Sequence, residues 1–392
     1  MQRYLDARVA ADLQKKLVFL TGPRQVGKTT LSRLLMQDLR AQYLNYDVAA
    51  DRAVILQQSW RLDAQLLVLD EIHKMPQWKN WLKGVVDGKP AAQQLLVTGS
   101  ARMETFRQSG DSLAGRYRAL RLHPLSVREW CMLAPAELRS ALHAGQAPTP
   151  EQALERLLER GGFPEPMLES DPIDADRWRR QYIDGLVRED VMEFSRIHEL
   201  GAMRLFVDML RERVGSPLSL ASLARDLNLA QPTLRRYLDI LQALFIVFVV
   251  PPWHRNIARA VLQQPKVYFY DTGLVRGTGS EGDGARFENL MACHLLKHAQ
   301  WQQDALGRPC QLHYLRTKDG AEVDFALSDG EQLTHLVECK WSDATPHRAL
   351  ARFAADFPQA LAVQAVRHLR QPEQRGAIAI THAAQWLAEL SA

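Results

Sequence analysis

The chain has 392 residues, a formal net charge of +4 and a hydrophobic content of 46%, so we expect a few domains with ordinary cores, and the charge alone does not indicate a nucleic-acid partner. Its four cysteines lack CxxC spacing, which argues against a structural zinc site and against a disulfide framework. The sequence shows neither a signal-peptide core nor an apolar run long enough to span a membrane, so we expect a cytoplasmic location and no membrane partner.

The first chemical motif lies between a predicted strand at residues 17–20 and a predicted helix at 29–39. Glycines followed by a lysine and a threonine give the GxxxxGK[ST] spacing of a phosphate-binding loop. Glycine permits close backbone approach, and the helix N-terminus faces the phosphates. Lys28 would reach the β- and γ-phosphates of ATP, and the Thr29 hydroxyl would bind Mg²⁺. The residues expected to contact the nucleotide are Gly22, Pro23, Arg24, Gln25, Val26, Gly27, Lys28, Thr29 and Thr30.

Two later strands carry polar residues at their ends. Residues 66–69 are apolar throughout, as in a strand buried on both faces, and Asp70 and Glu71 follow them. Asp70 would hold Mg²⁺, and Glu71 would polarise the attacking water as the catalytic base. Thr98 follows the apolar run 95–97 and is the first candidate to contact the γ-phosphate or the water. Ser100 is the second candidate, and an ordinary strand-to-turn exit is the alternative.

Five blocks of sequence occur in the order seen in a known family, namely residues 20–30, 69–74, 98–100, 113–116 and 122–126. In this order they resemble the AAA+ ATPase class, and more closely a large bacterial and archaeal family of predicted ATPases. The resemblance implies an α/β fold in which a parallel sheet carries helices on both faces. The buried strands predicted above agree with that fold.

The same resemblance singles out Arg116. AAA+ proteins often supply an arginine across a subunit interface to the γ-phosphate, where it stabilises transition-state charge. Arg116 is a candidate for that catalytic role, and a surface salt bridge or a contact within its own subunit is the alternative. Because AAA+ proteins usually act as rings, the resemblance also implies a homo-oligomer, with a hexamer as the suggested size.

The middle of the chain has two predicted parts. A helical linker or lid is predicted at 131–204, where the charged residues of a helix at 178–196, Asp184 among them, form a solvated face. A winged helix-turn-helix is predicted at 205–272, with helices at 219–227 and 231–243 and a strand at 245–250. DNA binding is one interpretation and protein docking is the other. The arginines that could contact phosphates are Arg235, Arg236, Arg255 and Arg259.

The segment 273–392 carries a second constellation. Glu288 lies on a predicted helix at 286–297, Asp324 on the second strand of a hairpin, and Glu338 and Lys340 on one face of the next strand. This order resembles the PD-(D/E)xK nuclease superfamily. The resemblance implies that Glu288, Asp324 and Glu338 bind Mg²⁺ and that Lys340, as the catalytic lysine, positions the water or the phosphate. A nuclease-like fold that does not cut is the alternative.

Together these features predict an AAA+ P-loop domain at 1–130, followed by the linker, the winged helix and a nuclease-like domain. The leading interpretation is a protein that binds and hydrolyses ATP with Mg²⁺ and acts on DNA, by remodelling it or by gating a nuclease. One alternative is a nucleotide-dependent switch that assembles a signalling or defence complex. The other is a DNA-binding ATPase with an inactive nuclease-like domain. No particular protein partner is indicated.

Overall fold

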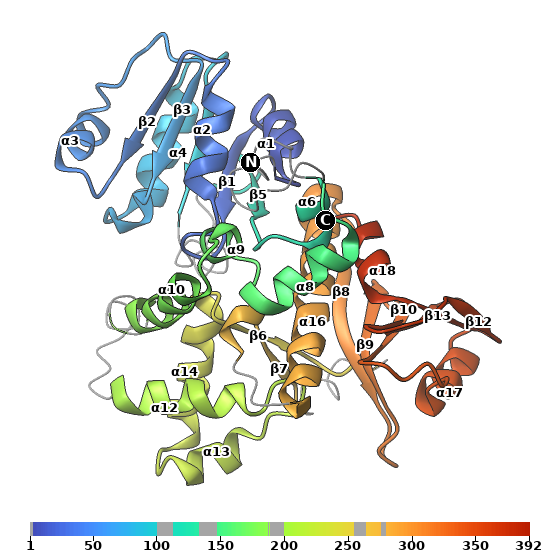
Figure 1. The fold of residues 1–392 in the computed structure, drawn as a ribbon. Coiled ribbons are helices and arrows are strands. Elements are labelled where there is room, and N and C mark those ends of the chain that lie inside the picture. Colours follow the sequence, from blue (N-terminus) through green and yellow to red (C-terminus); the bar gives the residue numbers. More distant parts are fainter. Residues whose placement is uncertain are drawn as a thin grey trace. The chain divides into compact units, whose positions relative to one another are not determined.

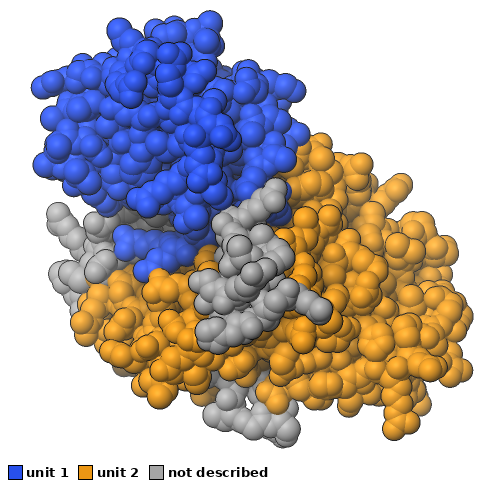
Figure 2. All heavy atoms as spheres, turned by 45° about the horizontal axis from the view of Figure 1, so that its top comes forward, with its two compact units in different colours: residues 1–123 blue, residues 124–392 orange. Residues whose placement is uncertain are grey.

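The computed structural model describes residues 3–99, 113–132, 147–186, 188, 200–254, 264–275 and 280–392. The chain divides into two compact units, Met1–His123 and Pro124–Ala392, which Figure 2 shows in different colours. Ser100, Arg255 and Arg259, named above as candidates, lie outside the described residues. Within the described part of the chain, no helix combines the length and the apolar character that a membrane crossing needs.

The first unit is built on a five-stranded parallel sheet with the order β2-β3-β4-β1-β5 (Figure 1). This confirms the parallel sheet expected from the sequence. Its elements are α1 (Asp6–Leu13), β1 (Leu17–Thr21), α2 (Lys28–Met36), β2 (Ala41–Asn45), α3 (Ala49–Gln57), β3 (Leu66–Asp70), the short 3₁₀ turn η1 (Ile72–Lys74), α4 (Trp78–Gly88), β4 (Gln94–Thr98) and β5 (Tyr117–Arg121).

Helices cover both faces of this sheet (Figure 1). Alternate side chains of a strand point to opposite faces, and one set, which includes Phe19, Leu69 and Val97, packs against α3 and α4. Trp78 of α4 meets Phe19 edge to face with ring centroids 5.9 Å apart. Helix α1 contacts β1 and β4, and α2 contacts β4. The central strands are therefore buried on both sides, which is why they read as continuous apolar runs.

The second unit begins with helices and ends in a mixed sheet. Its helical part comprises α6 (Val127–Cys131), α8 (Pro150–Arg160), α9 (Pro164–Leu168), α10 (Pro172–Gly185), α12 (Leu200–Arg211), α13 (Leu220–Asp226) and α14 (Gln231–Ala243). The remaining elements are β6 (Val247–Val250), β7 (Lys266–Phe269), η3 (Thr272–Leu274), α16 (Ser280–Leu306), β8 (Cys310–Arg316), β9 (Glu322–Asp329), β10 (Gln332–Lys340), α17 (Arg348–Asp356), β11 (Leu361–Val366), β12 (Glu373–Arg375), β13 (Ile378–His382) and α18 (Ala383–Glu389).

The two predicted helices of a helix-turn-helix are present as α13 and α14. The Ser219 side chain caps α13 by accepting a hydrogen bond from Ser222 N at 3.3 Å. Asn228 takes the left-handed conformation (φ 52°) in the turn, which asparagine tolerates better than most residues. The predicted strand at 245–250 begins later, at Val247. Phe245 is itself left-handed, and its N–H donates to Gln242 O at 3.0 Å, so it ends α14 instead.

The second unit is completed by a six-stranded sheet with the order β12-β13-β11-β10-β9-β8. Strands β8, β9 and β10 are antiparallel, whereas β10, β11 and β13 run parallel. Helix α17 packs on this sheet through Leu350 and Phe353, and α16 contacts β8, β9 and β10. Helix α16 begins before the predicted 286–297 and also ends after it, and buried Ala299 and Ala305 extend its apolar face beyond residue 297.

The start of the second unit is tied to α16. Lys297 forms a buried ion pair with Glu129 of α6, and its Nζ donates to Pro124 O at 3.1 Å. His294 accepts a hydrogen bond from Val127 N at 3.0 Å. Residues 124–130, which the sequence assigned to the first domain, therefore group with the second unit.

Candidate functional site

The loop between β1 and α2 has the backbone that a phosphate site requires. Gly22 has φ +147°, and a Cβ at this position would lie 2.3 Å from Leu122 O. Gly27 is left-handed (φ 103°) and precedes α2, whose first turn receives no side-chain cap. The uncapped N–H groups at this helix start can donate to an anion. The predicted loop residues therefore fit a nucleotide phosphate.

Lys28 is folded back onto this loop. Its Nζ donates to Gly22 O at 2.9 Å and to Pro23 O at 2.6 Å, and the residue is 9% exposed. Burial lowers the pKa of Lys28 to about 8, while the charges of Glu71 and Asp70 act in the opposite direction. A phosphate in the loop would supply the anionic partner that this buried ammonium needs.

Arg3, which precedes α1, holds the loop in place. Its Nη1 donates to Val26 O at 2.7 Å, and its Nη2 donates to His123 O. The residue is 6% exposed, so its guanidinium spans the phosphate loop and the end of the first unit. These contacts give Arg3 a structural role in holding the loop.

Asp70 is fixed by three donors at the carboxyl end of β3. Its Oδ1 accepts from Thr98 Oγ1 at 2.6 Å and from Glu71 N at 3.0 Å, and its Oδ2 accepts from the Tyr43 hydroxyl. Asp70 and Thr98 are direct partners in the pairing of β3 with β4. The Thr98 hydroxyl, predicted to contact phosphate or water, here positions Asp70.

Tyr43 is a site residue that sequence reasoning missed. Burial and then its hydrogen bond to Asp70 raise the pKa of Tyr43, while a side-chain hydrogen bond to Thr29 acts in the opposite direction. The Tyr43 hydroxyl thus joins the two predicted Mg²⁺ ligands of the first unit, Thr29 and Asp70. Tyr43 lies on β2, and no motif marks it, because its role depends on β2 lying beside β3.

Glu71, the predicted catalytic base, follows the end of β3 in a left-handed conformation with φ 56°. Its N–H donates to Thr98 O at 3.1 Å. Its Oε2 lies 3.6 Å from His73 Nε2 and 3.8 Å from Lys74 Nζ. Burial and then the charge of Asp70 raise the pKa of Glu71. A raised pKa makes a carboxylate a better proton acceptor near neutral pH.

Arg116 lies away from these groups in the first unit. Its Nε donates to Asp87 Oδ1 of α4 at 2.9 Å, and the Arg116 side chain is 37% exposed. It precedes β5, whose first residue, Tyr117, pairs with Leu17 at the amino end of β1. Arg116 is therefore at the amino edge of the sheet, whereas the phosphate loop follows the carboxyl end of β1.

Comparison with protein-family models agrees with this geometry. Residues 14–131 match a model described as an AAA domain. This segment is an AAA+ P-loop domain. Two further models, each described as a domain of unknown function (DUF8612 and DUF4143), match residues 151–279 and 283–382.

The chain spans only about two thirds or less of the length of the three sequence relatives described next. Uncharacterized proteins of Mycobacterium tuberculosis and Mycobacterium bovis are each 31% identical over 316 residues, which is 79% of this chain and 66% of theirs. The Holliday junction branch migration complex subunit RuvB of Bifidobacterium adolescentis is 29% identical over 176 residues, 41% of this chain and 43% of RuvB. A solved structure of Thermotoga maritima RuvB is 18% identical, with a TM-score of 0.34, over 64% of this chain and 90% of that one.

Outside the AAA+ domain, the fold brings the predicted nuclease-like residues together. Two backbone-to-carboxylate contacts join Asp324 on β9 to Glu338 and its neighbour Cys339 on β10. Cys339 N donates to Asp324 Oδ2 at 2.9 Å, and Asp324 N lies 3.4 Å from Glu338 Oε2. Lys340 Nζ donates to Glu338 Oε1 at 2.7 Å. Burial and then the charge of Glu288 raise the pKa of Asp324, so Glu288 of α16 belongs to the same cluster.

A lysine that the sequence analysis did not consider enters this cluster. Lys266 Nζ lies 2.7 Å from Glu322 Oε1, 3.4 Å from Glu288 Oε1 and 3.8 Å from Asp324 Oδ1. In the described residues, no group of three or more His, Cys, Asp and Glu side chains is arranged to hold a metal ion. The donor set does not fit a divalent cation, because an ammonium lies where these carboxylates converge.

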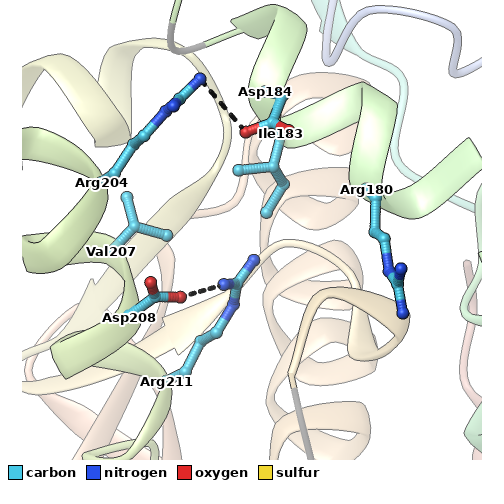
Figure 3. Close-up of a pocket in the computed structure, with 7 residues that line it drawn as sticks. All are labelled: Arg180, Ile183, Asp184, Arg204, Val207, Asp208 and Arg211. Atoms are coloured by element: carbon cyan, nitrogen blue, oxygen red, sulfur yellow. Dashed lines mark hydrogen bonds and ion pairs between the residues drawn. The ribbon is translucent and has the colours of Figure 1, made fainter. Parts of the chain in front are cut away.

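A separate pocket lies between α10 and α12 of the second unit (Figure 3). Arg204 Nη2 lies 3.4 Å from Asp184 Oδ1, and Arg211 pairs with Asp208. Asp184 was expected on a solvated face, and it is exposed there while it forms an ion pair with Arg204 of another helix. Because these arginines already have acidic partners, we assign the pocket a role in joining two helices.

Proposed function

We propose that the protein binds and hydrolyses ATP with Mg²⁺ through its AAA+ domain and acts on DNA as a homo-oligomer. The observation that supports this most directly is the carboxyl edge of the parallel sheet. There the uncapped start of α2 and the buried Lys28 follow β1, and Asp70 with Glu71 ends β3 beside Thr98.

Each residue has a role in this proposal. The loop amides and Lys28 bind the phosphates, and Lys28 exchanges its two backbone carbonyl partners for phosphate oxygens. Mg²⁺, held by Thr29 and Asp70, would neutralise charge on the phosphates. Tyr43 and Thr98 orient Asp70. Glu71 accepts the proton of the attacking water after leaving His73 and Lys74.

The proposal of a DNA substrate rests on two observations. One relative is named as a subunit of a complex that migrates Holliday junctions. In the second unit, α14 presents Arg235 and Arg236 on its exposed side, while Leu234, Tyr237 and Leu238 are buried. A two-stranded antiparallel sheet, β6 with β7, follows α14. This arrangement suits a winged helix-turn-helix in which α14 faces DNA.

The deciding experiment measures ATP hydrolysis by the full chain without DNA and with single-stranded, duplex, forked and four-way-junction DNA. We expect one DNA structure to stimulate turnover. Glu71→Gln should lower turnover about 10²- to 10⁴-fold while keeping ATP binding, as expected for a lost general base. Lys28→Ala should lose ATP binding. Flat turnover across all DNAs, without DNA binding at low salt, would contradict action on DNA.

A nucleotide-dependent switch is the second candidate function. The contacts of Glu71 with Lys74 and with the His73 ring favour it, because a general base that is held by neighbouring side chains supports only slow ATP hydrolysis until it is released. In a switch, ATP binding would control the assembly of a complex, and α13 with α14 would dock a protein. Slow turnover that no DNA changes, together with ATP-dependent assembly in light scattering, would support this candidate.

A further inference from the structure

We infer that Lys266 is a built-in cation of the acidic cluster in the second unit, and that it keeps this cluster from binding a divalent metal. The acidic cluster comprises Glu288, Glu322, Asp324 and Glu338. The residue order predicts a metal site here, but the structure fills the place where the carboxylates converge with the ammonium of a strand residue. This inference concerns the second unit and is independent of the proposed ATPase.

The contacts of Lys266 are those expected of a resident cation. Its Nζ lies within 4 Å of three carboxylates, on Glu288, Glu322 and Asp324. The ammonium lies 5.5 Å from the ring centroid of Tyr314, a cation–π distance. Its side chain is 1% exposed. A buried lysine persists only when it is paired, and here the pairing uses the carboxylates that a metal would need.

The carboxylates of the cluster also accept hydrogen bonds from other neighbouring side chains. Tyr268 on β7 donates to Glu288 Oε1 at 2.7 Å. Glu338 Oε1 accepts from Lys340 Nζ at 2.7 Å and lies 3.2 Å from His347 Nδ1. Gly215 closes another side, since a Cβ there would lie 2.7 Å from Glu288 Oε1. A metal would have to displace an ammonium and break these hydrogen bonds.

Lys266 is also held in place by its backbone. It begins β7 and pairs with Val250 of β6. A bridge to Pro217 flanks it, and Leu218 N donates to Pro265 O at 2.8 Å. The lysine therefore joins the small sheet after α14 to the six-stranded sheet that carries Glu322 and Asp324. The cluster acts as an ionic connection between these two parts of the second unit.

The test measures Mn²⁺ binding to the full chain without nucleotide. The EPR signal of free Mn²⁺ reports how much of the ion remains unbound. All variants carry Asp70→Asn, so that the ATPase site contributes no ion. We expect the Asp70→Asn protein and its Asp324→Asn derivative to bind Mn²⁺ equally. Lys266→Met keeps the side-chain length and removes the charge. The Lys266→Met variant should bind one further Mn²⁺ ion, with an affinity about tenfold or more above that of the parent. The reason is that the substitution removes a positive charge that lies within 4 Å of the carboxylates and would repel the metal ion. Asp324→Asn should abolish this gain.

Three results would overturn the inference. The first is that the parent protein binds Mn²⁺ and that Asp324→Asn abolishes this binding. The second is metal-dependent cleavage of plasmid DNA by the wild-type chain that is lost in Asp324→Asn. The third is a folded Lys266→Met variant that binds no additional ion. If Lys266→Met does not fold, the first two comparisons still decide, since neither uses it.

Discussion

At the scale of single residues, Lys28 shows how burial and function are linked. Its folded pKa of about 8 lies below the 10.5 of an ordinary lysine, mainly because of burial. Between these two values the unfolded chain binds more protons than the folded chain. The free energy of unfolding contributed by this group therefore rises with pH from about 8 to 10.5. Burying the Lys28 ammonium without a close anionic partner lowers the stability of the fold. A bound phosphate would offset this loss by pairing with the ammonium.

This predicts that ATP binding takes up protons. A triphosphate against Lys28 favours its charged form and raises its pKa. With a pKa of about 8, roughly half of the molecules are neutral at pH 8 and about one tenth at pH 7. Calorimetry in excess Mg²⁺, with two buffers of different ionisation enthalpy, should give an uptake of about half a proton at pH 8 and about 0.1 at pH 7. Equal uptake at both pH values, or proton release, would contradict this assignment.

At the scale of elements, α13 and α14 form a helix pair whose exposed side carries arginines. The turn between them depends on Asn228, whose N–H donates to Arg225 O at 3.1 Å. The buried side of α14 fixes its rotation, so Arg235 and Arg236 are exposed next to each other. Adjacent residues on a helix face different directions, and two long side chains can then contact separate phosphates.

We predict that replacing both Arg235 and Arg236 with alanine weakens DNA binding. Each lost phosphate contact should also lower the slope of log affinity against log salt by about 0.9. Fluorescence anisotropy over a range of salt concentrations measures both quantities. The matched control is Lys318→Ala with Arg375→Ala, which removes two exposed charges from the six-stranded sheet domain. Equal losses in the two double variants would show that net charge, and not α14, drives binding.

At the scale of the whole molecule, the topology of the sheet decides which subunit could use Arg116. Strand β5 is parallel to β1 and begins level with it. Arg116 is therefore separated from the phosphate loop by the length of β1, roughly 16 Å at about 3.3 Å per residue. It cannot serve the ATP of its own subunit in this arrangement. Only a homo-oligomer would bring it to a γ-phosphate.

This predicts complementation between two inactive variants. If Arg116 acts across an interface, Arg116→Ala should lower turnover about 10³-fold or more. Mixing it with Glu71→Gln should restore part of the activity, because mixed interfaces pair an intact Arg116 with an intact Glu71. Asp87→Ala breaks the surface ion pair alone and should stay active. Full turnover by Arg116→Ala would leave Arg116 with only its structural role.

The sequence located much of the candidate site, because its signals are local. The loop at Gly22–Thr29 and the carboxylates after β3 lie where the motifs predicted, and the helices α13 and α14 were found within a residue or so. Glu288, Asp324, Glu338 and Lys340 were also expected to converge, and the fold brings them together. Their predicted metal role does not fit the ammonium of Lys266, which lies among the same carboxylates. The role of Thr98 as a phosphate sensor stays a prediction.

The sequence alone determined most of the strands and helices and which loop has the phosphate-binding pattern, because apolar periodicity and glycine spacing act over neighbouring residues. The tertiary structure decided which partner each polar side chain contacts. Tyr43 reaches Asp70 only because β2 pairs with β3, and Lys266 reaches three carboxylates only because β7 lies against the six-stranded sheet domain. The charge that neutralises a buried acid comes from packing between distant segments, and no local pattern encodes it.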